Sequence, residues 1–285
     1  MNREKPFIIA VFHQKGGVGK TTTSLQLGAW FAAKHISTLM VDLDPSANLS
    51  AGVGVALSDK EPFILDVLLG NQRLSDVVKP TKIPLLSLVP SHQDMQLASK
   101  YLNMRPHYSS LLRIAFGLGD RLGLKYQNEI SLQGVPRNER RIILFDRIIM
   151  DCSPTIDSVS ITALSAADLV LIPTLAEYFS VKALEGVFRL IETVRAETNA
   201  LLDYRIFVTM FDKESDAQKK ILEKLRLNYS DYLLNSVIEN DRHIQYSQLM
   251  AEPIFALYPK SNIAQQYISL AKEINNYENT RCLRS

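Results

Sequence analysis

One stretch decides the fold of this chain: Phe12-His13-Gln14-Lys15-Gly16-Gly17-Val18-Gly19-Lys20-Thr21-Thr22. It follows the apolar run 7–12 and opens a helical pattern, which is the strand–loop–helix context of a phosphate-binding loop. Its glycines let backbone N–H groups point at an anion, and the helix that begins there adds its own unpaired N–H groups. In such a loop Lys20 reaches the β- and γ-phosphates of a nucleotide and the Thr21 hydroxyl ligates Mg²⁺. The sequence therefore predicts a nucleotide site here.

The loop departs from the general pattern G-x-x-x-x-G-K-[ST] at its first position. Gln14 stands where that pattern has glycine, and a second lysine, Lys15, follows it. A cation on the loop itself suits a phosphate that is held from one further direction. The alternative is a solvated turn rich in glycine and lysine, and the strand and helix patterns on either side argue against it.

Carboxylates follow two further apolar runs. Asp42 and Asp44 come after the run 38–41, and Asp151 comes after the run 148–150. An Asp at the end of such a strand is expected to hold the Mg²⁺ hydration shell opposite the loop hydroxyl. Of the first two, one carboxylate near Mg²⁺ and one near the attacking water would divide the work, and capping of the turn is the alternative.

Apolar runs that predict buried strands alternate with helical patterns along the chain. The runs lie at residues 7–12, 38–41, 85–89, 148–150, 169–173 and 206–210. The helical patterns lie at residues 21–34, 93–102, 181–197, 215–227 and 262–274. Repeated strand-then-helix units predict a three-layer α/β fold, with a mainly parallel twisted sheet and helices on both faces. Ligands of such sheets bind at the carboxyl ends of the strands, where the loop sits.

The cysteine content and the lengths of the apolar runs limit the compartment and the kinds of site that this chain can have. Two cysteines, Cys152 and Cys282, stand far apart in 285 residues of net charge +2. They favour a reducing cytosol and argue against a zinc or iron–sulfur site within one chain, although a site shared across a dimer stays open. No apolar run approaches the ~20 residues that span a bilayer, and the first run is too short for a signal peptide. We therefore expect a cytoplasmic protein.

We expect one domain over residues 1–285. The segment 117–141 is rich in glycine and scattered charge, and it is expected to be an elaborated surface connection. The last residues, 275–285, are expected to be a frayed tail. The turn 153–157 follows Asp151 and is well placed to sense a γ-phosphate, as switch segments do.

Three motifs resemble those of the deviant Walker ATPases of the ParA/MinD group: Lys15-Gly16-Gly17-Val18-Gly19-Lys20-Thr21-Thr22, Asp42-Leu43-Asp44-Pro45 and Asp151-Cys152-Ser153-Pro154. The likeness continues through residues 46–50, 208–212 and 252–254 and covers nearly the whole chain. The short ParA/Soj proteins, which lack an N-terminal DNA-binding module, are the most similar subgroup. The third motif departs from the common spelling Asp-Cys-Pro-Pro-Ser, because Ser153 and Thr155 replace the first proline and the serine.

The resemblance implies a partitioning or positioning ATPase that uses ATP and Mg²⁺. Two subunits would sandwich two ATP molecules, with Lys15 reaching the nucleotide of the partner subunit. Asp44 would orient the hydrolytic water, and Thr21, Asp42 and Asp151 would support the metal. The implied nucleotide-binding residues are Lys15, Gly16, Gly17, Val18, Gly19, Lys20, Thr21, Thr22 and Met210. Of these, Lys15 and Lys20, together with Asp44, form the implied catalytic set.

The resemblance also implies partners: a ParB-like protein that stimulates slow hydrolysis, and DNA bound by the homodimer without sequence preference. The family's frequent Pro-Arg-Asn segment corresponds here to Glu239-Asn240-Asp241, which moves the DNA role to other basic residues. The candidates are Arg242, Lys219, Lys220, Lys224 and Lys260, for which an ordinary helix surface is the alternative.

Other functions fit the same scaffold. The cargo could be a plasmid or chromosome, or another body such as a carboxysome or chemotaxis cluster. A MinD-like protein would end in a membrane-binding helix, but the terminal stripe reads as core packing, so a membrane partner is not expected. The stripe consists of Ile263, Tyr267, Leu270 and Ile274. A metabolic enzyme on the same scaffold is a further alternative. Nitrogenase-type iron proteins need cysteines that bridge a cluster across the dimer, scaffold-carrier relatives need a C-x-x-C, and dethiobiotin-synthetase-like ligases use a loop without the Lys15 feature. An arsenite ATPase normally has two fused halves.

Overall fold

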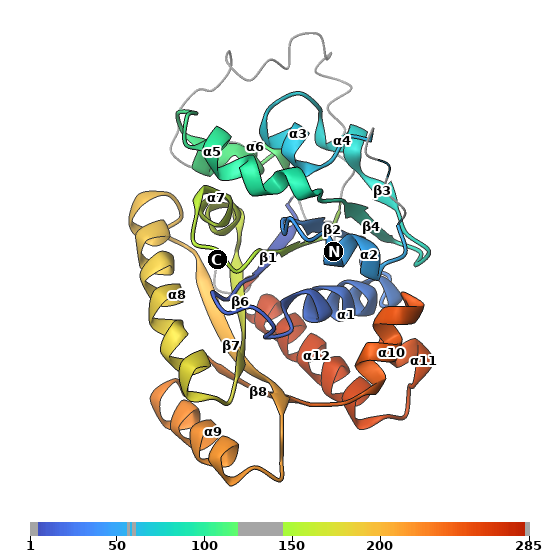
Figure 1. Cartoon of the computed structure of the whole chain (residues 1–285), viewed down its shortest axis with the longest axis vertical. Coiled ribbons are helices and arrows are strands. Elements are labelled where there is room, and N and C mark those ends of the chain that lie inside the picture. The colour runs from blue at the N-terminus through green and yellow to red at the C-terminus, as the bar shows by residue number, and fades with distance from the viewer. Residues whose placement is uncertain (1–4, 56–57, 59–60, 119–144, 283–285) are drawn as a thin grey trace.

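The computed structural model describes residues 5–55, 58, 61–118 and 145–282. Its centre is an eight-stranded sheet in the order β3-β4-β2-β5-β1-β6-β7-β8 (Figure 1). Neighbouring strands are parallel except β3, which runs antiparallel to β4 at the edge. The strands are β1 (Phe7–Val11), β2 (Thr38–Asp42), β3 (Lys79–Pro80), β4 (Leu86–Val89), β5 (Arg147–Asp151), β6 (Leu169–Leu175), β7 (Asp203–Phe211) and β8 (Leu233–Glu239). The predicted α/β class is confirmed.

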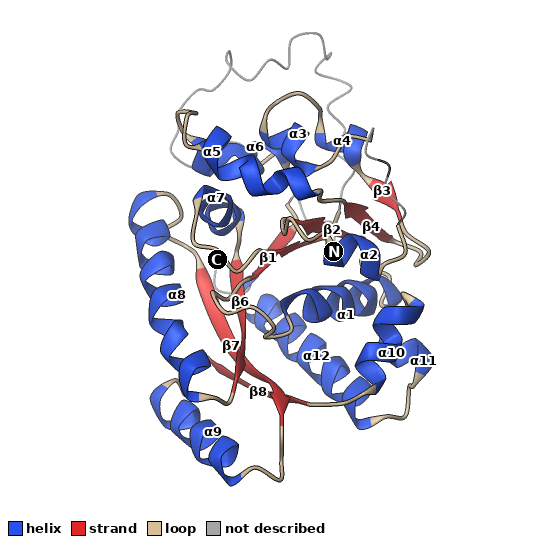
Figure 2. Ribbon diagram, viewed as in Figure 1, coloured by secondary structure: helices blue, strands red, loops and turns tan. Residues whose placement is uncertain are grey.

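Helices cover both faces of the sheet (Figure 2). They are α1 (Lys20–Ala33), α2 (Asn48–Gly52), α3 (Ile64–Leu68), α4 (Leu74–Val77), α5 (Ala98–Leu102), α6 (Leu111–Ala115), α7 (Ser158–Ala166), α8 (Tyr178–Glu197), α9 (Asp216–Asn228), α10 (His243–Met250), α11 (Ile254–Leu257) and α12 (Asn262–Cys282). Short 3₁₀ turns lie at Gln93–Leu97 and Tyr108–Ser110.

Alternation along the strands feeds two separate cores. In β1, Ile8 and Ala10 pack with α3 to α9 on one face, whereas Ile9 and Val11 pack with α1, α2 and α10 to α12 on the other. All five residues of β1 are buried. Because both faces are covered, the strand reads as a continuous apolar run rather than as an alternating one.

Parallel pairing brings the carboxyl ends of three strands together. Val11 and Asp151 are register partners in β1 and β5, and Asp42 and Asp151 are partners in β2 and β5. The loop that follows β1 and the carboxylates that end β2 and β5 therefore share one edge of the sheet, as expected for a ligand site in this class of fold.

The six strands expected from the sequence are present, with bounds that differ by a few residues. The helix expected at 93–102 is instead a 3₁₀ turn followed by α5. Strand β8 was not predicted, because its residues mix buried, half-buried and exposed positions and leave only a weak apolar pattern. The connection expected at 117–141 lies outside the described residues, apart from Gly117 and Leu118.

The expected frayed tail is wrong for residues 275–282, which continue α12. Side chains tie this part of the helix to the strands. The Arg147 guanidinium donates a hydrogen bond to Asn275 Oδ1 (2.8 Å) and forms a buried ion pair with Glu278. The Tyr277 hydroxyl donates to Asp203 Oδ2 at 2.6 Å. Polar contacts of this kind leave no apolar repeat in the sequence. The apolar pattern therefore ends at residue 274, although the helix continues to residue 282.

The apolar stripe of α12 packs in the core, as predicted. Ile263, Tyr267, Leu270 and Ile274 are each at most 4% exposed. A helix whose apolar face is already buried has none left for a lipid surface. In the part of the chain that the structure describes, no helix is long and apolar enough to cross a bilayer.

Candidate nucleotide-binding site

Glycines shape the loop between β1 and α1. Gly17 and Gly19 have φ of +73° and +84°, a conformation that strains any residue with a Cβ atom. An ideal Cβ built at Gly16 or Gly17 would meet no atom within 4 Å, so the space beside the loop is open. Gly19 immediately precedes α1, whose first N–H groups receive no side-chain cap. The loop thus presents backbone donors to an open space, which is what an anion site requires.

The Lys20 side chain turns back into this loop. Its Nζ lies 3.4 Å from the Lys15 carbonyl oxygen, and the residue is 7% exposed. Burial lowers the pKa of Lys20, while the neighbouring charges of Asp151 and Asp44 oppose that shift. The ammonium therefore lies inside the cradle, where it fits the predicted contact with phosphate oxygens.

Lys15 points a different way. Its Nζ forms an ion pair with Glu177 Oε2 at 2.8 Å, and about a third of the side chain is exposed. Its backbone N–H donates to Nδ1 of the buried His13 at 2.9 Å, which anchors the start of the loop. The two loop lysines thus differ in setting: Lys20 lies within the cradle and Lys15 lies at the surface.

Asp42 and Asp151 end adjacent strands and are both buried. Asp42 Oδ2 accepts hydrogen bonds from the Ser50 backbone and hydroxyl, at 2.9 and 2.8 Å. Burial raises the pKa of Asp42 above its usual range, and these hydrogen bonds oppose the shift. Burial also raises the pKa of Asp151, and the neighbouring Asp42 charge raises it further. Two buried carboxylates side by side call for a cation between or beside them.

The donor set fits a nucleotide-bound Mg²⁺. Asp151 Oδ1 accepts a hydrogen bond from the Ser24 hydroxyl (3.1 Å), whereas Oδ2 has no hydrogen-bond partner among the described groups. Thr21, at the start of α1, lies close enough to favour the charged form of Asp151. No group of three His, Cys, Asp or Glu residues in the described ranges could hold a metal ion alone. Mg²⁺ that keeps waters and shares phosphate oxygens needs only one or two carboxylates and a hydroxyl.

Asp44 lies in the turn after β2. Its Oδ1 accepts from the Ser46 backbone at 2.9 Å and from the Ser46 hydroxyl at 2.6 Å. Asp42 Oδ1 in turn accepts from the Asp44 backbone at 3.1 Å. Both carboxylates therefore cap this turn, and the structure keeps Asp44 half-buried beside the loop rather than in the core.

The turn after Asp151 is closed by a chain of hydroxyls. Ser153 Oγ lies 2.7 Å from Thr155 Oγ1, which donates to Asp157 Oδ2 at 2.9 Å. Asp157 then caps α7 through the N–H groups of Val159 and Ser160. The residues that depart from the common spelling of this motif thus make a polar network that connects the turn after Asp151 to the N-terminus of α7.

Met210 is brought to the loop from the end of β7. Its Cε would lie 3.7 Å from a Cβ at Gly19, and it has a φ of +50°. The preceding residue, Thr209, donates from its hydroxyl to the Val18 carbonyl oxygen at 2.9 Å. Strand β7 therefore contacts the loop from the side, and its end brings Met210 next to Gly19.

Sequence reasoning missed three supporting residues: Ser24, Ser50 and Glu177. Ser24 is one helical turn from Lys20, and this spacing could have identified it. Ser50 lies in the segment 46–50, over which the likeness to the family continues, but no role was assigned to it. Nothing in the sequence indicated Glu177, because its contact with Lys15 joins residues 162 positions apart.

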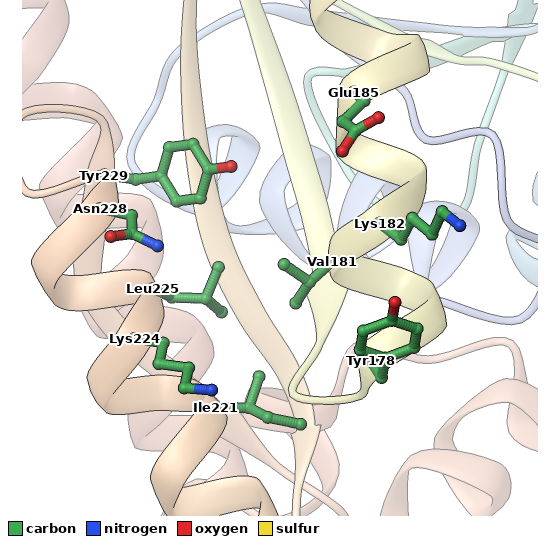
Figure 3. A pocket seen from close by; sticks show the side chains of 9 residues that line it. All are labelled: Tyr178, Val181, Lys182, Glu185, Ile221, Lys224, Leu225, Asn228 and Tyr229. Atoms are coloured by element: carbon green, nitrogen blue, oxygen red, sulfur yellow. The ribbon is translucent and has the colours of Figure 1, made fainter.

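The basic residues expected to contact DNA belong to several different elements. Lys219 pairs with Asp216 on α9, while Arg242 and Lys260 precede α10 and α12. Lys224 lines a groove of about 330 Å³ between α8 and α9 (Figure 3). Lys182 stands across that groove, and its apolar lining includes Val181 and Leu225. This groove is separate from the phosphate loop, since no loop residue lines it.

Cys152 is buried directly after Asp151, and burial raises the pKa of its thiol. A thiol in such surroundings is inert.

The fold and the loop define a P-loop nucleoside triphosphatase. A family model described as an AAA domain matches residues 7–204. The sporulation initiation inhibitor protein Soj of Bacillus subtilis (strain 168) is 32% identical over 272 residues, which cover 94% of this chain and 97% of Soj. The chromosome partitioning protein ParA of Caulobacter vibrioides (strain NA1000 / CB15N) is 26% identical over 275 residues, 96% of each chain. The chain belongs to the ParA/Soj-like P-loop ATPases.

A solved structure connects this family to its cofactors. Cobyrinic acid a,c-diamide synthase from Mycobacterium smegmatis with bound ATP analog and magnesium superposes with a TM-score of 0.75 at 25% identity, covering 94% of this chain and 93% of that one. The present protein is accordingly an ATPase whose cofactors are ATP and Mg²⁺, and its relatives make it a ParA-like positioning ATPase.

Proposed function

We propose that this ATPase is switched by ATP between a monomer and a homodimer, and that the dimer binds DNA without sequence preference until hydrolysis releases it. The observation that carries the proposal is the different setting of the two loop lysines. Lys20 lies inside the cradle of its own subunit, whereas Lys15 stands at its surface, 2.8 Å from Glu177. A surface cation on the phosphate loop is available to the nucleotide of a second subunit.

The residues divide the work as follows. Backbone N–H groups of residues 16–22 and the Lys20 ammonium hold the phosphates. The Thr21 hydroxyl and the carboxylates of Asp42 and Asp151 hold the metal and its waters. Mg²⁺, when bound, neutralises charge on the β- and γ-phosphates. Asp44 orients the hydrolytic water, for which its half-buried position beside the loop is suited.

Sizing with and without nucleotide tests the switch. Wild type should run as a monomer without nucleotide and as a dimer with ATP and Mg²⁺. Lys20→Ala should fail to bind ATP and stay monomeric, and Asp44→Ala should bind ATP and remain dimeric because it hydrolyses too slowly to dissociate. Hydrolysis by Asp44→Ala at the wild-type rate would remove Asp44 from the catalytic set.

Binding to DNA rests on the basic residues of α9 and of the segments before α10 and α12. Phosphate contacts release counterions, so the affinity should fall steeply with salt. We expect DNA binding only with ATP, and loss of that binding when Lys220 and Lys224 are both changed to glutamine. Retention on DNA at high salt without ATP would contradict this part of the proposal.

A ParB-like protein is the proposed activator, and a plasmid or chromosome the proposed cargo, in the cytoplasm. The Soj and ParA relatives support this choice over another cargo. A pull-down from the native cell with Asp44→Ala, whose trapped dimer should retain its partner, would identify both. A carboxysome or chemotaxis component in the pull-down would favour the alternative cargo.

A further inference from the structure

The contact between Lys15 and Glu177 has a consequence for assembly. Glu177 is the residue before α8, and its side chain makes no capping bond to that helix. Its carboxylate instead accepts a hydrogen bond from Lys15 Nζ at 2.8 Å, with both side chains partly exposed. The carboxylate therefore holds the loop lysine and makes no hydrogen bond to the first turn of its own helix.

The neighbouring loop residue leans on the same helix. A Cβ at Gly186, in the third turn of α8, would meet Gln14 Oε1 at 2.0 Å. The Gln14 amide thus lies against the α8 backbone at a place that only glycine leaves open. Gln14 and Lys15, the two residues by which the loop departs from the general pattern, are both seated on α8 of their own chain.

We propose that Glu177 is an intramolecular latch: it holds Lys15 on its own subunit and must release it before Lys15 reaches the nucleotide of a second copy. This inference rests on the proposed function, in which Lys15 acts across the dimer. A triphosphate carries several negative charges and Glu177 carries one. The Lys15 ammonium is therefore attracted more strongly to the nucleotide of a second copy than to Glu177. The latch sets the concentration at which dimers form and does not forbid them.

The surroundings of the ion pair strengthen the latch when a second copy approaches. Tyr178 and Phe179 follow Glu177 directly, and they are 66% and 74% exposed. Their rings meet edge to face at 5.3 Å and form an apolar surface beside the ion pair. A second copy that covers these rings would also remove water from the ion pair, which makes an unmatched Glu177 carboxylate more costly there.

The contact between Glu177 and Lys15 can be tested in the monomer, through the chemical reactivity of the Lys15 amine. An acylating reagent, acetic anhydride, is applied briefly to dilute nucleotide-free protein, and the modification of each lysine is followed by mass spectrometry. Glu177→Gln should raise the labelling of Lys15 several-fold and leave Lys20 unchanged. The matched control is Glu185→Gln, two turns further along the same helix, which should alter neither. Unchanged labelling of Lys15 in Glu177→Gln would overturn the latch.

Dimer formation gives the second readout, by sedimentation with a non-hydrolysable ATP analog and Mg²⁺. An exposed ion pair shifts an equilibrium by up to about fivefold, and a dimer opens two of them. Glu177→Gln should therefore dimerise at up to about 25-fold lower protein concentration than wild type, and Glu185→Gln at the wild-type concentration. A dimer that is unchanged or weaker in Glu177→Gln would overturn the latch, even if Lys15 labelling rises.

Failure of the proposed function has a different signature. If Lys15→Gln dimerises as wild type does, Lys15 has no role across the interface, whatever the labelling shows. If Lys15→Gln stays monomeric and Glu177→Gln fails either readout, only the latch falls.

Discussion

His13 should make the stability of this protein depend on pH between about 6.5 and 4. The residue follows β1 and is fully buried. Burial, and then the positive charge of Lys20, lower the pKa of His13 from 6.5 to about 4. As the pH falls below 6.5 the unfolded chain takes up a proton at this histidine and the folded chain does not. The contribution of His13 to the free energy of unfolding therefore decreases as the pH falls from about 6.5 to about 4.

The size of the effect follows from the shift. A difference of about 2.5 pKa units is worth about 3 kcal/mol of unfolding free energy at pH 4, and nothing above pH 7. Asp42 and Asp151 titrate with the opposite sign, since their raised pKa values favour the folded state as pH falls. The effect of His13 is therefore measured as a difference between variants.

The variant His13→Asn isolates the contribution of His13 to stability. Its amide oxygen can still accept the hydrogen bond from the Lys15 N–H, and the amide does not titrate. Urea unfolding is measured at several pH values for both proteins. Relative to wild type, the variant should gain about 3 kcal/mol between pH 7 and pH 4. His35→Asn, at an exposed histidine, should show no such gain. If the difference in unfolding free energy between wild type and His13→Asn stays constant from pH 7 to pH 4, His13 is not the source of the pH dependence.

Three further variants test other parts of the account. Glu278→Gln should destabilise the fold by about 3–5 kcal/mol, because it removes the carboxylate from a buried ion pair with Arg147. Glu61→Gln, at the more exposed ion pair with Lys79, should cost less than about 1 kcal/mol in the same urea assay. Ser50→Ala should cost about 1.5–3 kcal/mol, because Asp42 loses its 2.8 Å hydroxyl contact, and Ser46→Ala on the exposed side of the turn should cost less. Gly19→Ala should cost about 1–2 kcal/mol and weaken ATP binding measured by calorimetry, because φ of +84° strains a Cβ; unchanged ATP affinity would show that the loop can relax.

The sequence predicted the centre of the fold well and its margins poorly. Strands buried on both faces leave a continuous apolar run, so β1, β2, β5 and β6 could be recognised without a structure. Strand β8 could not, because one exposed and four half-buried positions leave no continuous buried run. The end of α12 could not either, because Glu278 and Asn275 hold it through Arg147, far away in the sequence.

The candidate site divides in the same way. Lys20, Asp42, Asp44 and Asp151 follow from motifs, because the ends of parallel strands meet at one edge of a sheet. The partners that set their environment do not follow from motifs. Ser24, which donates to Asp151, could have been indicated only by its spacing of one helical turn from Lys20. The contact of Glu177 with Lys15 joins residues 162 positions apart and depends on register and packing.

The most direct measurement of the central claim separates ATP binding from assembly in Lys15→Gln. Binding is followed with a fluorescent ATP analog and mass with light scattering, in the same samples with Mg²⁺. Lys15→Gln should bind the analog as wild type does and stay monomeric at concentrations where wild type is dimeric, while Lys20→Ala should bind none. A Lys15→Gln protein that dimerises with the wild-type midpoint would contradict the account.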